Sequence, residues 1–205
     1  MKPGRIRILI SSPGDVRQER DKARHVIEQL QHRYAEQLTL EAVLWEDLPL
    51  SATTSFQEGI DQVLDGANGI DIAVFILWYR LGSPLGSRIL NPDDGSEYRS
   101  GTEREFDLML RAHQQSGGER PEILAYVRED EKAFTSELDG KNTDELQTIL
   151  DQRKLAKSFI KSQFHDAEGG FNVGAYHLFS KPITFSHLLR THLKGMLDGL
   201  VDHLA

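Results

Sequence analysis

Two glutamates lie close together in the segment SGTEREFDLML, which spans residues 100–110. The pairs Ser100–Glu103 and Thr102–Glu105 each match the capping box that begins a helix, and acidic residues are favoured in a first helical turn. Only one of the two registers can cap the helix, so the pattern leaves one carboxylate over. The carboxylate that does not cap the helix is a candidate for a catalytic role. Helix capping and catalysis therefore both remain open for these glutamates.

The segment ISSPGD, residues 10–15, places two small hydroxyl groups before a predicted helix. It has neither the lysine of the GxxxxGK[ST] phosphate loop nor the spacing of GxGxxG. Ser12 is expected to cap the helix, with Pro13 in its first position, which leaves Ser11 for a ligand. The backbone N–H groups of such a helix start, up to Gly14, are suited to holding a phosphate or a ribose.

Aromatic and charged residues follow two other predicted strands. Trp78 and Arg80 end a very apolar run, and Trp45 and Glu46 end the run before it. At the mouth of a sheet such groups stack on a flat base; alternatively, the tryptophans belong to the core and the charges to solvated loops. Phe56 is either the first core residue of the next helix or an aromatic residue of a lid.

The composition excludes several kinds of site. The chain has no cysteine, which excludes a disulfide scaffold and a thiolate metal site and fits a reducing, cytoplasmic compartment. Its eight histidines form no HExxH pattern, so no metal site is predicted, and no GxSxG elbow is present. The balance of 24 basic against 32 acidic residues, net charge −8, argues against a nucleic-acid or membrane partner. The longest apolar stretch, residues 70–79, is too short to span a bilayer.

Hydrophobic periodicity predicts strands that alternate with helices along all 205 residues. The strands are expected over residues 5–10, 40–45, 70–79, 123–127 and 176–179. The helices are expected from residue 13 to about residue 34 and over residues 55–67, 102–114, 143–164 and 184–204. The longest loop of the first half is expected over residues 81–100, and a polar loop follows the fourth strand.

This alternation predicts an α/β fold with a five-stranded parallel sheet between two layers of helices. Five strands suit the flavodoxin-like order 2-1-3-4-5, with the run 70–79 in the centre because it is apolar on both faces. A ligand is expected beyond the carboxyl ends of the strands. We expect one domain over residues 1–205, with a core at about 5–130 and a helical extension at about 140–205.

Four segments carry a resemblance to a known family: ILISSPGDVRQERDKARHVIEQL, AVLWEDLPLSATTSFQEGID, DIAVFILWYRLGSPL and YRSGTEREF. Together they resemble the TIR-like effector domains at the N-termini of bacterial STAND proteins, which carry NACHT, WD-repeat or TPR modules. The resemblance covers about residues 5–130 and is most specific at SSPGDVxxER and SGTExEF. It implies the same flavodoxin-like fold.

Many TIR domains cleave NAD at the nicotinamide–ribose bond with a glutamate near the start of the helix after the third strand. The resemblance implies that Glu105, followed by Phe106, is this catalytic residue, and that Glu103 is the alternative. The chain differs from several TIR hydrolases at Gly101, where they have a tryptophan, and in having Ser11-Ser12 where a basic pair is common. The substrate-binding residues that we predict are Ser11, Ser12, Pro13, Gly14, Trp45, Glu46, Phe56, Trp78, Arg80 and Thr102.

The resemblance implies an NAD-hydrolysing or NAD-cyclising effector, with NAD as substrate and no bound cofactor. It also implies activation by self-association, driven by a C-terminal sensor module of the STAND type, in antiphage defence or signalling. Two alternatives remain at this stage: a non-catalytic TIR-like scaffold that self-associates, and a nucleotide-binding module of similar fold.

Overall fold

The computed structural model describes residues 4–44, 69–85, 89–165 and 175–204. The elements are β1 (Gly4–Ser11), a 3-10 turn (Gly14–Val16), α1 (Arg17–Tyr34), β2 (Leu38–Val43), β3 (Ile72–Leu77), α3 (Gly101–Gln115), β4 (Glu122–Arg128), α4 (Glu131–Leu138), α5 (Thr143–Phe164), β5 (His177–Phe179) and α6 (Pro182–Leu204). The helix predicted over 55–67 lies outside the described residues.

The five strands form one parallel sheet in the order β2-β1-β3-β4-β5. This confirms the predicted α/β, flavodoxin-like fold. β3 is central, and all six of its residues are buried. Alternate β3 side chains face opposite layers: Val74 and Ile76 pack with the α1 and α6 side, whereas Phe75 and Leu77 pack with the α3 and α5 side. Because helices cover both faces of the sheet at β3, this strand does not alternate between apolar and polar residues.

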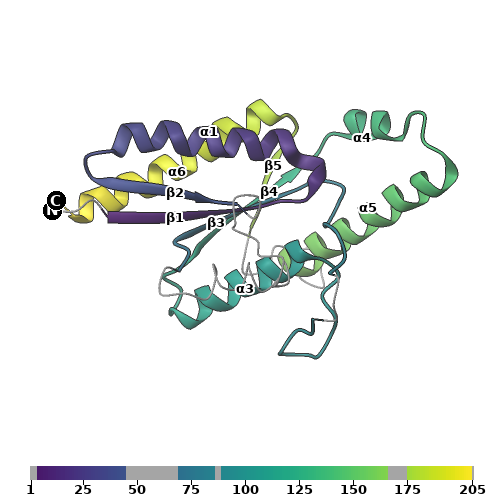
Figure 1. Cartoon of the computed structure of the whole chain (residues 1–205), viewed down its shortest axis with the longest axis horizontal. Helices are drawn as coiled ribbons and strands as arrows, with labels where there is room; N and C mark the ends of the chain where they lie inside the picture. The colour runs from purple at the N-terminus through teal and green to yellow at the C-terminus, as the bar shows by residue number, and fades with distance from the viewer. Residues whose placement is uncertain (1–3, 45–68, 86–88, 166–174, 205) are drawn as a thin grey trace, which may run out of the picture.

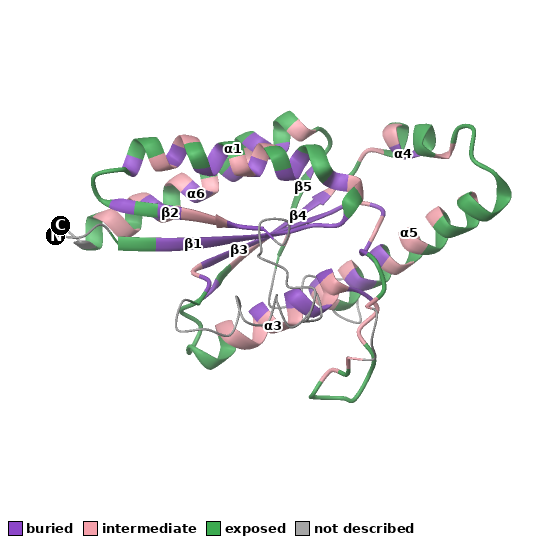
Figure 2. Cartoon of the chain, in the orientation of Figure 1, coloured by how far each residue is buried: buried purple, intermediate pink, exposed green. Residues whose placement is uncertain are grey.

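Figure 1 shows α1 and α6 together on one side of the sheet and α3 and α5 on the other. The inward faces of these helices are buried, and the outer part of α5 is exposed (Figure 2). The start of β1 and the end of α6 lie close together at one end of the molecule (Figure 1). The carboxyl ends of the strands point to the opposite end, which is where a ligand site is expected in this fold.

The start of α1 differs from the prediction. Ser12 does not cap a helix: α1 begins at Arg17 after the 3-10 turn, and no side chain caps either element. The Ser12 hydroxyl is buried without a hydrogen-bond partner among the described residues. Within this turn Asp15 accepts hydrogen bonds from the chain after β3, as described below.

The segment between β4 and α5 also differs from the prediction of a polar loop. It contains the eight-residue helix α4, whose start is capped when Asp130 accepts the backbone N–H of Ala133 at 2.9 Å. Phe134 is the one buried residue of this helix. A helix this short carries too few apolar positions to show a 3.6-residue period in the sequence.

Candidate functional site

The N-terminus of α3 is capped by Ser100. Its hydroxyl accepts the backbone N–H of Glu103 at 3.1 Å and donates to the carbonyl of Leu81 at 2.9 Å. The Glu103 carboxylate turns back to Arg99, accepting its backbone N–H at 2.6 Å and its Nε at 2.8 Å. The first of the two sequence registers is therefore the real cap, and Glu105 is the carboxylate left over.

Glu105 lies next to the end of β1. Its Oε2 accepts a hydrogen bond from the Ser11 hydroxyl at 2.5 Å, and both residues are buried, at 8% and 1% exposure. Burial raises the pKa of Glu105 to about 7, although the Ser11 hydrogen bond and the nearby charge of Arg104 favour the ionised form. Near neutral pH this residue can hold or release a proton, which is the property required of an acid–base group.

Gly101 lies next to the second carboxylate oxygen of Glu105, Oε1. Because glycine has no side chain, nothing at position 101 packs on this oxygen. A Cβ added at Gly101 would lie 3.9 Å from Oε1 of Glu105 and 3.8 Å from the side chain of Leu85. A larger residue here would therefore pack directly on the carboxylate.

Asp15 connects the turn after β1 to the end of β3. Its Oδ2 accepts the backbone N–H groups of Tyr79 at 3.1 Å and Arg80 at 3.0 Å. Burial raises the pKa of Asp15 to about 6, against the opposing effect of these hydrogen bonds. Its second oxygen is buried and has no hydrogen-bond partner in the described part of the chain.

These contacts form a closed ring of which Glu105 is a member. From Asp15 the ring runs through the chain after β3 to Leu81, then through Ser100 to α3, and from Glu105 back to Ser11. Together these hydrogen bonds hold the carboxylate of Glu105 at the carboxyl edge of the sheet. Residues preorganised by such bonds are a common feature of sites that stabilise charge.

No model of a known protein family matches the chain. No curated protein matches it either.

The structure brings only part of the predicted site together. Ser11 and Glu105 are in direct contact, and Thr102 is buried in the first turn of α3 close to Gly82, where an added Cβ would lie 3.1 Å from its Oγ1. Pro13 is buried and Gly14 is exposed at the start of the 3-10 turn. Trp45, Glu46 and Phe56 lie outside the described residues.

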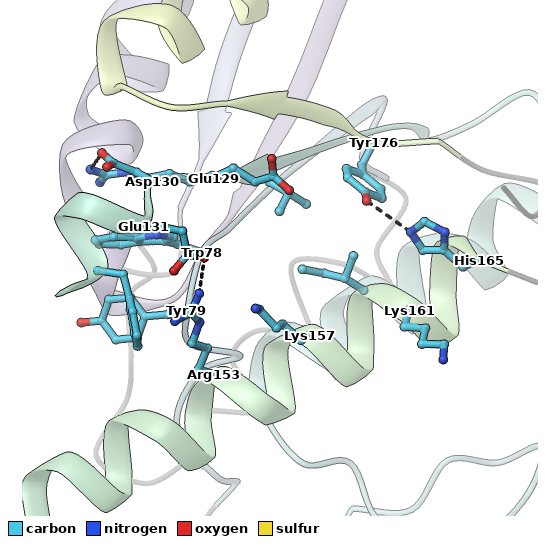
Figure 3. A pocket seen from close by; sticks show the side chains of 14 residues that line it. Trp78, Tyr79, Glu129, Asp130, Glu131, Arg153, Lys157, Lys161, His165 and Tyr176 are labelled. Atoms are coloured by element: carbon cyan, nitrogen blue, oxygen red, sulfur yellow. Dashed lines mark hydrogen bonds and ion pairs between the residues drawn. The ribbon is translucent and has the colours of Figure 1, made fainter. Parts of the chain in front are cut away.

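Trp78 belongs to a second region of the same sheet edge. A cavity of about 370 Å³ lies beyond the carboxyl ends of β3 and β4; Trp78 lines it (Figure 3), whereas Arg80, Ser11 and Glu105 do not. The guanidinium of Arg128 lies 4.0 Å from the centre of the Trp78 ring. Trp78 is partly buried and also packs against the core, as the second interpretation of this residue expected.

Two features of this edge were not singled out from the sequence. The bonding of Asp15 to the β3 end depends on tertiary structure, and no local pattern indicates it. The basic residues Arg153, Lys157 and Lys161 follow one face of α5 at spacings of four, and this regular spacing was a usable signal.

Among residues 4–44, 69–85, 89–165 and 175–204, no group of three or more His, Asp or Glu side chains is arranged to hold a metal ion. Within these same ranges, none of the helices combines the length and the apolar character needed to cross a membrane.

Proposed function

We propose that this chain is a TIR-like effector domain that cleaves NAD at the nicotinamide–ribose bond, with Glu105 as its catalytic carboxylate. One observation carries the proposal. Glu105 is a buried carboxylate at the carboxyl edge of the sheet that takes no part in helix capping and instead accepts a hydrogen bond from Ser11 at 2.5 Å. The resemblance in the SSPGDVxxER and SGTExEF segments supplies the substrate class.

The reaction needs little besides a well-placed negative charge. The bond between C1′ of the ribose and the ring nitrogen of nicotinamide breaks, and its electron pair stays on that nitrogen, which becomes neutral. Positive charge develops on the ribose, as in glycoside hydrolysis, and an adjacent carboxylate stabilises it. Because nicotinamide leaves as a neutral molecule, no acid is needed to protonate it.

The second half of the reaction releases a proton. Water adds to C1′ and loses one proton, or an internal nucleophile takes the place of water and gives a cyclic product. A carboxylate whose pKa is about 7 accepts this proton better than an ordinary glutamate at neutral pH. The neighbouring segment from Ser11 to Gly14 is the candidate surface for the nicotinamide ribose.

The proposal includes activation by self-association, driven in the natural setting by a sensor module of the STAND type in antiphage defence or signalling. The test therefore compares a dilute monomer with a chain fused to an oligomerising partner. Nicotinamide release from NAD is measured for the wild type, Glu105→Gln and Glu103→Gln. We expect activity in the oligomer, a loss of at least about 100-fold in Glu105→Gln, and a small effect in Glu103→Gln, which pairs with Arg99.

Other outcomes select the alternatives. Full turnover by a demonstrably monomeric sample contradicts the requirement for self-association. Loss of activity in Glu103→Gln but not in Glu105→Gln means that the other carboxylate does the chemistry. An oligomer that binds NAD without cleaving it is a nucleotide-binding module, and one that neither binds nor cleaves NAD is a scaffold.

A further inference from the structure

The two outer strands of the described sheet, β2 and β5, differ in length. β5 has only three residues, whereas β2 has six. The backbone N–H and C=O groups along the free side of an outer strand can pair with another strand, and proteins limit this by keeping such strands short or by covering them. β5 is short enough to offer little pairing, so the longer β2 is the edge that needs a cover.

The backbone groups of β2 that face outward are those of its even-numbered residues. The C=O of Gln37 accepts the N–H of Gly4 at 3.1 Å, and Gly4 lies opposite Leu38 in the parallel pairing with β1. Successive residues of a strand direct their backbone groups to opposite sides, so the N–H and C=O groups of Leu38, Leu40 and Ala42 point away from β1. These are the groups that a further strand would bind.

The side-chain amide of Gln31, near the end of α1, binds two of these outward groups. Its Nε2 donates to the C=O of Leu38 at 3.2 Å, and its Oε1 accepts the N–H of Leu40. In a parallel sheet, one residue of a neighbouring strand makes the same pair of bonds, donating to one residue and accepting from the residue two positions later. The amide of Gln31 therefore occupies the position that the backbone of a further parallel strand would take opposite Thr39.

The tight connection between α1 and β2 holds Gln31 in this place. α1 ends at Tyr34, β2 begins at Leu38, and the N–H of Gln37 donates to the C=O of Tyr34 at 3.0 Å. Tyr34 is buried, and its hydroxyl donates to Asp198 of α6. Gln31 lies about one helical turn before Tyr34, so the packing of this part of α1 fixes the Gln31 side chain beside β2.

We propose that the Gln31 amide blocks strand addition at β2, and that without it a second copy of this chain adds to the sheet through its own β2. A two-fold axis between two copies brings the same edge of each together, which gives an antiparallel β2–β2 pair and one sheet continuous through both copies. A second copy is the expected partner because it presents an edge of equal length with the same outward groups.

The test compares Gln31→Ala with the wild type by amide hydrogen exchange and by light scattering after gel filtration. In the dilute chain, we expect the amide of Leu40 to exchange about tenfold faster or more in Gln31→Ala, because it loses its acceptor. At higher concentration, we expect Gln31→Ala to dimerise at least about tenfold more tightly than the wild type. Gln18→Ala is the matched control, because Gln18 is an exposed glutamine at the start of the same helix, and it should behave as the wild type.

Two further variants locate the contact. Ala42→Pro removes an outward N–H of β2, and proline is tolerated where the free side of an outer strand loses its N–H. Gln31→Ala combined with Ala42→Pro should therefore return to the association of the wild type. Gln31→Met keeps the length of the side chain without its amide, should dimerise like Gln31→Ala, and replaces it as the test if the alanine variant unfolds.

Unchanged exchange of the Leu40 amide, or association of folded Gln31 variants no tighter than in the wild type, would overturn the proposal. Association that persists with Ala42→Pro would place the contact on another surface and overturn it as well. Nicotinamide release is not measured in these experiments, so their outcome is independent of the proposed function.

Discussion

The carboxylate of Asp15 accepts the backbone N–H of Arg80 at 3.0 Å and so joins two chain segments that are 65 residues apart. Asp15 also accepts the N–H of Tyr79, and it is buried deeply enough to raise its pKa to about 6. The contact lies between the turn after β1 and the end of β3, the two segments that flank the Ser11–Glu105 pair. Removing this contact therefore tests whether it holds the two segments of the candidate site together.

Replacing Asp15 with alanine should lower the free energy of unfolding by about 2–3 kcal/mol, because two buried N–H groups lose their acceptor. Asp15→Asn retains one carbonyl oxygen as an acceptor, so its free energy of unfolding should fall by less. Urea denaturation at pH 7 measures both, with Asp21→Ala on the exposed face of α1 as the control, expected within about 0.5 kcal/mol of wild type. A loss in Asp15→Ala as small as in the control would mean that this contact adds no stability.

Glu105 should make the protein less stable as the pH rises. Its pKa is about 7 in the folded chain and near 4.5 when unfolded, so between these values the folded state binds more protons and the free energy of unfolding falls. Glu105→Gln removes this titration and should be more stable than wild type at pH 8, by about 1–3 kcal/mol, but similar at pH 4. Denaturation midpoints at the two pH values provide the measurement. Equal differences at pH 4 and pH 8 would show that Glu105 titrates at an ordinary pKa.

Ser11→Ala tests the hydrogen bond to Glu105 directly. The hydroxyl favours the ionised carboxylate, so its loss should raise the pKa of Glu105 further and shift the rise of kcat/KM for NAD to higher pH. At pH 7 we expect a loss of about threefold to tenfold that is largely recovered above pH 8. A loss that is the same at every pH would assign Ser11 to substrate contact instead.

Gly82 is a position where only glycine fits. Its φ of +117° lies outside the range that L side chains adopt readily, and a Cβ there would lie 3.1 Å from Oγ1 of Thr102. Gly82→Ala should therefore cost about 1–3 kcal/mol of unfolding free energy. Gly14→Ala is the control, because no atom lies within 4 Å of its added Cβ and its φ is not in that region. Thermal melting of the two variants gives the comparison.

The sheet was predictable because its signals are local and strong. Ile72–Leu77 is apolar at every position, which only a strand covered on both faces tolerates, and the alternation of helices and strands then gives the parallel order. The leftover carboxylate was predictable for a similar reason, since two overlapping capping patterns cannot both be satisfied. Ser100 proves to be the cap, and Glu105 takes no part in capping.

The rest depends on contacts between distant segments. Ser12 has every local feature of a helix cap, yet helix α1 begins only at Arg17, and Asp15 in the preceding turn bonds to Tyr79 and Arg80, which follow β3. No local pattern indicates the cavity either, since Trp78 and residues of α5 line it together only after α5 packs beside the sheet. Short-range preferences decide neither feature, because the energies of the tertiary contacts are larger than those of a single cap.

The start of β1 and the end of α6 lie together at the end of the molecule opposite the carboxyl ends of the strands (Figure 1). The eight residues of β1 alone span about 25 Å between these two ends. An oligomerising partner fused before β1 or after α6 is therefore attached a full strand length from Glu105. A fusion at either position therefore joins copies of this chain at the end of the molecule opposite the candidate site.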